Sequence, residues 1–208
     1  MMEILNWGPA LDKLRNTIAE NPTIYKLAQE LPELYKGKRG LMVVDVVASR
    51  QRRYEKYVVA KLLPMYIDQA EDLSLACLAA NVPDWLPLKD QEAQTMSTVA
   101  SNILDFGRAH GLVDEDTMAK SWAQDLEAIE LMKQVFGIGP ALVEYLRMLS
   151  GSDSLKVDVR VINGFEALGL PVHLFSPDGI LELAKQLSRK VPCSLIELDQ
   201  CLWHILGS

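Results

Sequence analysis

The sequence is poor in cysteine, and its cysteines and histidines are scattered. The three cysteines are Cys77, Cys193 and Cys201, and no two of them form a CxxC pair. This pattern excludes a disulfide framework and the common zinc sites. We therefore expect reduced thiols and no bound metal.

Long apolar runs are also missing. No run approaches the roughly 20 residues that a membrane-spanning helix requires. The stretch from Met1 to Asn21 lacks the charged and then apolar layout of a signal peptide. We therefore expect a cytoplasmic protein without a membrane partner.

The sequence has fewer basic than acidic residues. The 208 residues include 21 Lys and Arg against 28 Asp and Glu, which gives a formal net charge of −7. At first sight this total argues against a nucleic-acid partner, whose phosphates need cations. With 49% hydrophobic and 24% charged residues, the composition is typical of a soluble protein with one or two small domains.

The pattern that is present is helical. Apolar residues recur every three or four positions between Asp90 and Gly107, which predicts an amphipathic helix. Ser176-Pro177-Asp178 and the pair Ser194 and Glu197 have the spacing of N-terminal caps, so two more helices are predicted to begin there. Two others are expected in the first 35 residues, each with a proline near its start.

Two stretches have a strand-like composition. Leu41 to Val47 is rich in β-branched residues, and Lys156 to Val161 alternates charged and apolar residues. A helical stripe continues from the first stretch through Tyr54 to Leu62, which favours a buried helix. Periodicity leaves the second stretch open, and the alternation of Lys156 with Asp158 predicts an exposed lysine.

A tight turn is predicted at Val135-Phe136-Gly137-Ile138-Gly139-Pro140, between two segments of helical periodicity. Gly137 and Gly139 permit backbone angles that other residues resist, and Pro140 suits the first turn of a helix. Such a turn exposes backbone amides at a helix N-terminus, where a phosphate can bind without a side-chain cation. An ordinary turn between two antiparallel helices is the alternative interpretation.

Downstream of this turn the sequence resembles a known family. Nineteen residues after Gly139 comes Asp158, within Val157-Asp158-Val159-Arg160-Val161, and the helix-like run that follows ends at Leu168-Gly169. A G-[IV]-G turn followed by V-D-x-[HR]-V and then L-G resembles the helix-hairpin-helix DNA glycosylase superfamily, of the endonuclease III type.

The resemblance extends in both directions. Asp199, Trp203 and Ile205-Leu206-Gly207 are similar to the pattern of the family's last helix. More loosely, Ala48-Ser49-Arg50-Gln51 resembles the start of the helix beside the family's base pocket. The resemblance is most specific over residues 135–170 and loosest before residue 90.

The resemblance implies a catalytic role for Asp158. In glycosylases of this type the aspartate stabilises the positive charge that develops on the sugar as the base departs, or it activates the nucleophile that attacks C1′. The target base must first flip out of the duplex. The other interpretation of Asp158 is a helix N-cap that contributes about 1 kcal/mol. One residue can serve both purposes.

The chain also departs from the family. Bifunctional members carry a lysine in the second helix of the hairpin, whose amine forms a Schiff base with C1′. Here Pro140-Ala141-Leu142 follows Gly139, so the resemblance implies a monofunctional enzyme. Endonuclease III holds an iron–sulfur cluster through four cysteines beyond its last helix. This sequence stops at Ser208, where that segment would begin, so no cluster or other cofactor is expected.

Charge is segregated along the sequence. Residues 36–61 carry eight basic side chains against Asp45 and Glu55, a net +6 that leaves −13 for the rest. Such a segment could follow a phosphate backbone, and a solvated helix face with loop lysines is the alternative. The predicted DNA-binding residues are Gly137, Ile138, Gly139, Arg160, Arg50, Gln51 and Arg53.

We therefore predict an all-α protein of two helical subdomains, with a helix-hairpin-helix motif and a cleft between the subdomains. The expected segments are N-terminal helices that pack on the terminal-helix subdomain (1–35), a central helical subdomain (36–134) with the basic segment 36–61, the hairpin and the Asp158 segment (135–170), and C-terminal helices (171–208).

The expected function is that of a monomeric, monofunctional DNA glycosylase, which hydrolyses the N-glycosidic bond of a damaged, flipped-out base in double-stranded DNA. A helix-hairpin-helix DNA-binding protein without catalysis is one alternative. A protein-interaction module, in which the hairpin is purely structural, is the other.

Overall fold

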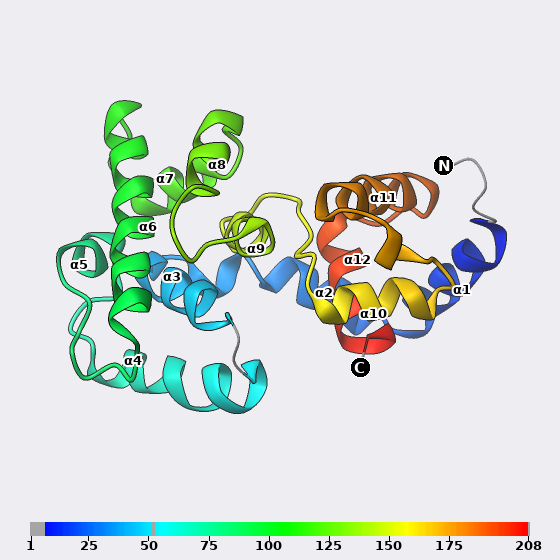
Figure 1. Ribbon diagram of the computed structural model, residues 1–208, viewed down its shortest axis with the longest axis horizontal. Helices are drawn as coiled ribbons and strands as arrows, with labels where there is room; N and C mark the ends of the chain where they lie inside the picture. The colour runs from blue at the N-terminus through cyan, green and yellow to red at the C-terminus, as the bar shows by residue number, and fades with distance from the viewer. Residues whose placement is uncertain (1–6, 51–52, 208) are drawn as a thin grey trace. The chain divides into compact units, whose positions relative to one another are not determined.

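The protein is built from helices in two compact units. The computed structural model describes residues 7–50 and 53–207, and within these ranges every regular element is a helix (Figure 1). The expected all-α class is confirmed. Unit 1 comprises Met1–Leu31 and Asp153–Ser208, and unit 2 comprises Pro32–Ser152. The turn at residues 135–140 and Asp158 therefore belong to different units.

Unit 1 is formed by the segments that precede and follow unit 2 in the sequence, and these segments pack around one apolar core. Leu14 of the first segment and Phe165, Leu183 and Leu198 of the second are fully buried in this core. The helical elements are α1 (Trp7–Glu20), α2 (Thr23–Glu30), α10 (Val159–Ala167), η4 (Val172–Leu174), α11 (Pro177–Lys190), α12 (Leu195–Cys201) and η5 (Leu202–Leu206).

The two predicted caps in unit 1 are confirmed. The Ser176 hydroxyl accepts a hydrogen bond from the amide of Gly179 at 3.2 Å, and α11 begins at the following proline. Ser194 and Glu197 form a reciprocal capping box at the start of α12, where the Ser194 hydroxyl accepts from the amide of Glu197 at 3.1 Å. These local bonds satisfy amides that a helix start leaves without an intrahelical partner.

Helix α10 and the π-helix η5 approach each other closely, and two glycines make this possible. A Cβ at Gly164 of α10 would lie 2.7 Å from the carbonyl oxygen of Leu202, and a Cβ at Gly207 would clash with the carbonyl of Arg160. Side chains larger than hydrogen therefore cannot be placed there without moving backbone.

Gly164→Ala should destabilise unit 1 by about 1–3 kcal/mol, because the new methyl group meets backbone that cannot rotate away. Gly179→Ala is the matched control, since its Cβ would find its nearest neighbours at 3.4 Å. The control should stabilise the protein by about 0.4–1 kcal/mol. Urea unfolding of both variants measures the difference, and equal effects would contradict the close packing.

Unit 2 has its buried centre at α3. All ten residues of α3 are buried, from Arg39 to Ala48. The helical elements of this unit are η2 (Glu33–Tyr35), α3 (Arg39–Ala48), η3 (Tyr54–Leu62), α4 (Leu63–Gln69), α5 (Leu75–Ala80), α6 (Asp90–Ala109), α7 (Glu115–Trp122), α8 (Leu126–Met132) and α9 (Pro140–Leu149). The helix predicted after Asp90 is α6, and its apolar stripe is buried.

The β-branched stretch at Leu41 to Val47 is a buried helix, as predicted. The stripe through Tyr54 to Leu62 does not continue that helix. The Ser49 hydroxyl donates back to the carbonyl of Val46 at 2.8 Å, and α3 ends at Ala48. Tyr54–Leu62 then forms the separate π-helix η3.

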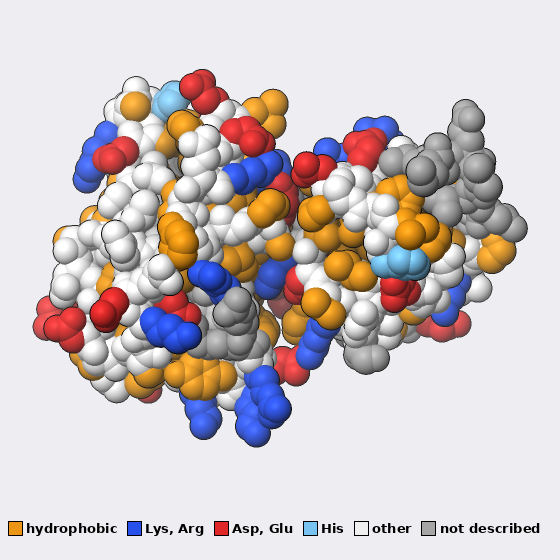
Figure 2. All heavy atoms as spheres, in the orientation of Figure 1, with side chains coloured by type: hydrophobic (Ala, Val, Ile, Leu, Met, Phe, Trp, Pro, Cys, Tyr) orange, Lys and Arg blue, Asp and Glu red, His pale blue; other side chains and the backbone are white. Residues whose placement is uncertain are grey.

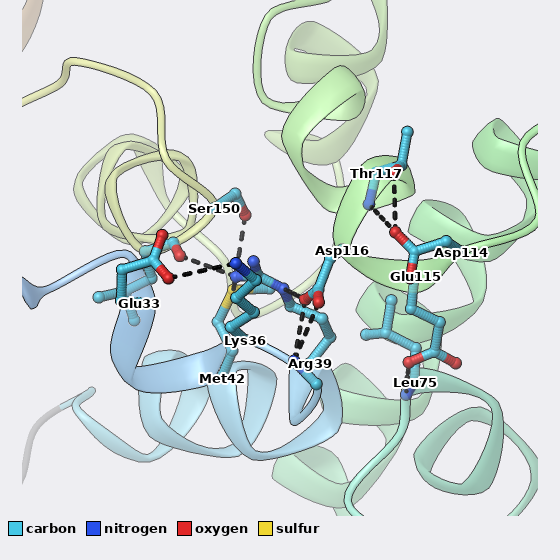
Figure 3. Close-up of polar contacts among 12 residues, drawn as sticks. Glu33, Lys36, Arg39, Met42, Leu75, Asp114, Glu115, Asp116, Thr117 and Ser150 are labelled. Atoms are coloured by element: carbon cyan, nitrogen blue, oxygen red, sulfur yellow. Dashed lines mark hydrogen bonds and ion pairs between the residues drawn. The ribbon is translucent and has the colours of Figure 1, made fainter.

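Three consecutive acids at the start of α7 connect three helices of unit 2 (Figure 3). Asp114 caps α7 by accepting from the amide of Thr117 at 2.8 Å. Glu115 accepts from the amides of Leu75 and Ala76, at 2.7 and 2.9 Å, and so caps α5. Asp116 accepts from the Nε of the buried Arg39 of α3 at 2.5 Å. Part of the acidic excess thus serves the fold.

Among the helices of residues 7–50 and 53–207, none combines the length and the apolar character that crossing a lipid bilayer requires.

Candidate functional site

In unit 1, Asp158 caps α10 and is hydrogen-bonded through both carboxylate oxygens. Its Oδ1 accepts from the amides of Arg160 and Val161, at 3.0 and 3.1 Å. Its side chain is 25% exposed, and Val159 beside it is 72% exposed. The helix N-terminus favours a negative charge at this point. The N-cap role is therefore established, and the carboxylate still reaches the surface.

Trp203 of η5 holds the second oxygen. Its indole Nε1 donates to Asp158 Oδ2 at 3.2 Å, and the Arg160 guanidinium lies 4.0 Å from the centre of its ring. The same tryptophan therefore orients the carboxylate and stacks on the predicted DNA-binding arginine. The close approach of α10 and η5 holds this arrangement in place.

Lys156 is mostly buried, and the prediction of an exposed lysine was wrong. Its side chain is 14% exposed, and Nζ lies 3.7 Å from Asp158 Oδ2. The alternation with Asp158 does not reflect a strand, because this segment has no regular secondary structure and leads into α10. Lys156 folds onto the carboxylate two residues further along and forms an ion pair with it.

Asp199 is a second carboxylate in this cluster, fully inside unit 1. Its Oδ1 accepts from the amide of Lys156 at 2.9 Å, and its Oδ2 accepts from the Gln200 side chain at 3.0 Å. Burial raises the pKa of Asp199 to about 7, and the negative charge of Asp158 acts in the same direction. Asp199 therefore titrates near neutral pH.

Stability should fall with rising pH because of Asp199. Below pH 3.8, the ordinary pKa of an aspartate side chain, the carboxyl is protonated in both the folded and the unfolded chain. Between pH 4 and about 7 the unfolded chain releases the proton first, which favours unfolding by at most about 1.4 kcal/mol per pH unit. Asp199→Asn should remove this dependence. Urea unfolding of wild type and variant at intervals from pH 4 to 7.5 measures this dependence. If the free energy of unfolding changes with pH in the same way for both proteins, the role of Asp199 is contradicted.

In unit 2, the turn between α8 and α9 contains the three predicted residues Gly137, Ile138 and Gly139. Gly137 has a φ of +86°, a conformation that favours glycine, and Ile138 is 3% exposed. Gly139 is the N-cap of α9, and a Cβ there would meet no atom within 4 Å. The backbone at Gly139 is thus open to a ligand, whereas Ile138 anchors the turn in the core.

Two side chains hold this turn from outside. The Thr95 hydroxyl of α6 lies 2.9 Å from the carbonyl oxygen of Phe136 and donates to it. The Arg50 guanidinium approaches the carbonyl oxygen of Gly137 at 3.5 Å. Phe136 itself is 64% exposed. The structure therefore brings Arg50 to the predicted turn.

Gln51 and Arg53 are the other two predicted DNA-binding residues of the basic segment. Gln51 lies outside the described residues. Arg53 lines a cavity of about 330 Å³ together with Lys56, Tyr57 and Lys61. Figure 2 shows basic side chains projecting at the lower edge of the view, where Figure 1 draws residues 53–65 in cyan. Arg39, by contrast, is buried against Asp116 and does not belong to any exposed basic surface.

A buried polar cluster also lies in unit 2. The Asp45 carboxylate accepts hydrogen bonds from the hydroxyls of Tyr35, Tyr54 and Tyr145, at 3.1 Å for Tyr54 and 3.0 Å for Tyr145. Burial, and then the charge of Asp45, raises the pKa of all three phenols. The tyrosines therefore stay protonated and donate to Asp45, which connects η2, α3, η3 and α9.

Among the described residues, no group of three or more His, Cys, Asp or Glu side chains is placed so that it could bind a metal ion. Burial raises the pKa of the Cys193 thiol to about 12 and that of Cys201 to about 11. These thiols are protonated at neutral pH and are poor nucleophiles.

Sequence reasoning missed several members of these sites. Lys56, Tyr57 and Lys61 lie in the predicted basic segment but were not among its predicted DNA-binding residues, and their closeness to Arg53 in the sequence is the signal that could have found them. The contributions of Thr95 and of the exposed Phe136 carry no comparable signal in the sequence.

Comparison with known proteins gave no match among protein-family models, curated proteins or solved structures.

Proposed function

We propose that this protein is a monofunctional DNA glycosylase that removes a damaged base from double-stranded DNA and acts as a monomer. The observation that carries the proposal is the Asp158 carboxylate, which is partly exposed at a helix N-terminus and oriented by the indole of Trp203. A single fixed carboxylate is the group that hydrolysis of an N-glycosidic bond requires.

In the proposed reaction, Asp158 acts on the sugar of a flipped-out nucleotide. As the bond between C1′ and the base breaks, positive charge develops on the sugar, and the carboxylate stabilises it or takes a proton from the attacking water. Two amides and one indole N–H fix the two oxygens, so little reorientation is needed during the reaction. The base leaves, and an abasic site remains.

Water rather than lysine is the proposed nucleophile. Residues 140–149, which form α9, contain no lysine. The Lys156 ammonium is paired with Asp158, and a protonated amine has no lone pair with which to attack C1′. The position of Lys156 is thus compatible with hydrolysis.

The turn at Gly137 to Gly139 is proposed to bind a DNA phosphate. In the first turn of α9, the amides of Leu142 and Val143 donate to the carbonyl of Gly139, whereas no hydrogen bond of the Ala141 amide is found among the described residues. The space beside Gly139 is open, so this amide can reach an anion. Arg50 lies at this turn and adds a positive charge. The exposed ring of Phe136 could contact a sugar or a base.

The experiment that tests the proposal uses duplexes that each contain one alkylated, oxidised or deaminated base. We expect the free base to be released from at least one duplex. Strand cleavage should appear only after alkali, and borohydride should trap no covalent complex. Cleavage without alkali, together with trapping that Lys156→Met abolishes, would contradict the monofunctional assignment. No base release from any duplex would contradict the function.

The second candidate is a DNA-binding protein without catalysis. It is favoured by the hydrogen bonds of Asp158, which already account for both carboxylate oxygens within the fold. This candidate predicts salt-sensitive binding of damaged duplexes, no base release and little effect of Asp158→Asn. Absence of DNA binding at low salt would instead favour the protein-interaction module.

A further inference from the structure

A cavity in unit 2 is lined by Arg53, Lys56, Tyr57 and Lys61. None of these four residues takes part in the reaction proposed at Asp158. Tyr57 and Lys61 lie four residues apart within the π-helix η3, and Arg53 is the extended N-cap residue that precedes it. Val58 and Leu62 of the same helix are buried in unit 2. One side of η3 is therefore fixed to the core, and another presents three cations and a phenol ring.

The three cations at this cavity are not neutralised. Arg53, Lys56 and Lys61 are exposed, and none of them makes an ion pair with any residue in 7–50 or 53–207. Lys36 and Arg39 of the same basic segment do have acidic partners, Glu33 and Asp116. Like charges around one cavity repel each other, so a bound anion would be favoured there.

The ring of Tyr57 favours an anion that also carries a flat, aromatic group. Arginine and lysine bind phosphate through charge-assisted hydrogen bonds, and an aromatic side chain offers a face on which a base can stack. The volume of about 330 Å³ lies in the range of small-ligand sites. A nucleotide combines the phosphate and the flat base that these four side chains would recognise.

We propose that this cavity binds one nucleotide unit, with its phosphate against Arg53, Lys56 and Lys61 and its base against Tyr57. The unit is either a free mononucleotide or one residue of a nucleic-acid strand. The inference does not depend on catalysis by Asp158, because the cavity residues belong to unit 2.

The test uses the full chain at low salt and titration calorimetry. The probes are inorganic phosphate, deoxyadenosine, dAMP and an undamaged single-stranded oligonucleotide. We expect dAMP to bind more tightly than phosphate or deoxyadenosine. Binding of the oligonucleotide with no binding of dAMP would identify the strand as the source. Failure of both to bind would overturn the proposal.

Two triple variants distinguish binding at this cavity from non-specific attraction to positive charge elsewhere on the protein. The triple variant Arg53→Gln, Lys56→Gln, Lys61→Gln should weaken the binding of whichever nucleotide probe binds by about tenfold or more. The matched control removes three exposed cations that are already paired with acids: Lys26→Gln, Arg108→Gln and Lys185→Gln. The control should leave binding within about twofold. Equal losses in the two variants would overturn the proposal.

Tyr57→Leu tests the base contact. This variant should keep the binding of inorganic phosphate and lose the advantage of dAMP over phosphate. If dAMP and phosphate bind equally to wild type and to Tyr57→Leu, the cavity is an anion site and the nucleotide assignment fails. Circular dichroism of each variant confirms that the helices are intact. Base release by the triple variant is measured in parallel, because it reports on the glycosylase function separately.

Discussion

Asp158→Asn should slow base release strongly while the protein remains folded. Asparagine keeps an oxygen that can accept from the amides of Arg160 and Val161, so α10 stays capped. It loses the negative charge that stabilises a cationic sugar or accepts a proton. We expect the single-turnover rate of base release to fall by about 10²–10⁴.

The matched control for this variant is Asp114→Asn. Asp114 is also an N-cap aspartate, which accepts from the amide of Thr117 in unit 2. The two substitutions make the same chemical change at the same kind of helix position. Asp158→Asn also loses the charge that pairs with Lys156, so its unfolding temperature should fall further than that of Asp114→Asn. Circular dichroism should show that both variants remain folded. If both variants release base at the wild-type rate, Asp158 has no catalytic role.

Asp116→Ala should be the most destabilising of the substitutions considered. It leaves the guanidinium of Arg39, which is 7% exposed, without the carboxylate that binds its Nε (Figure 3). Removal of one partner of a buried ion pair costs about 3–5 kcal/mol. We expect a loss near the lower end, about 3 kcal/mol, because the Asp116 side chain is 25% exposed.

Asp105→Ala is the control for the buried pair. Asp105 forms an ion pair with Arg108 on the surface of α6, where the side chains are 71% and 65% exposed. This substitution should change the free energy of unfolding by about 0.5 kcal/mol or less. Urea unfolding measures both variants. Similar values for Asp105→Ala and Asp116→Ala would show that the Arg39 pair contributes no more than a surface pair.

The helices of this protein could be predicted from the sequence because their signals are local. The caps at Ser176 and Ser194 act over three residues, and the apolar stripe of α6 repeats within one turn. The turn at Gly137 to Gly139 could be predicted for the same reason. Asp158 as a helix start could be predicted as well, since an N-cap side chain bonds to amides two or three residues further on.

The environments of charged side chains could not be predicted in this way. Lys156 was expected to be exposed, and its burial depends on how the chain folds onto Asp158. Arg39 counted as one of eight basic residues, but its partner Asp116 lies 77 residues further along the chain. The cavity at Arg53 likewise depends on how the extended residue Arg53 is placed beside η3, which the periodicity of apolar residues does not show.

The division of the chain sets an order for folding during synthesis. All of unit 2 is accessible once Ser152 has emerged from the ribosome, so it can fold while the rest of the chain is still being made. Helix α2 has to wait for its packing partner α12, and Asp158 has to wait for the indole of Trp203. A chain that ends before residue 195 would therefore contain all of unit 2 and an unassembled Asp158 site.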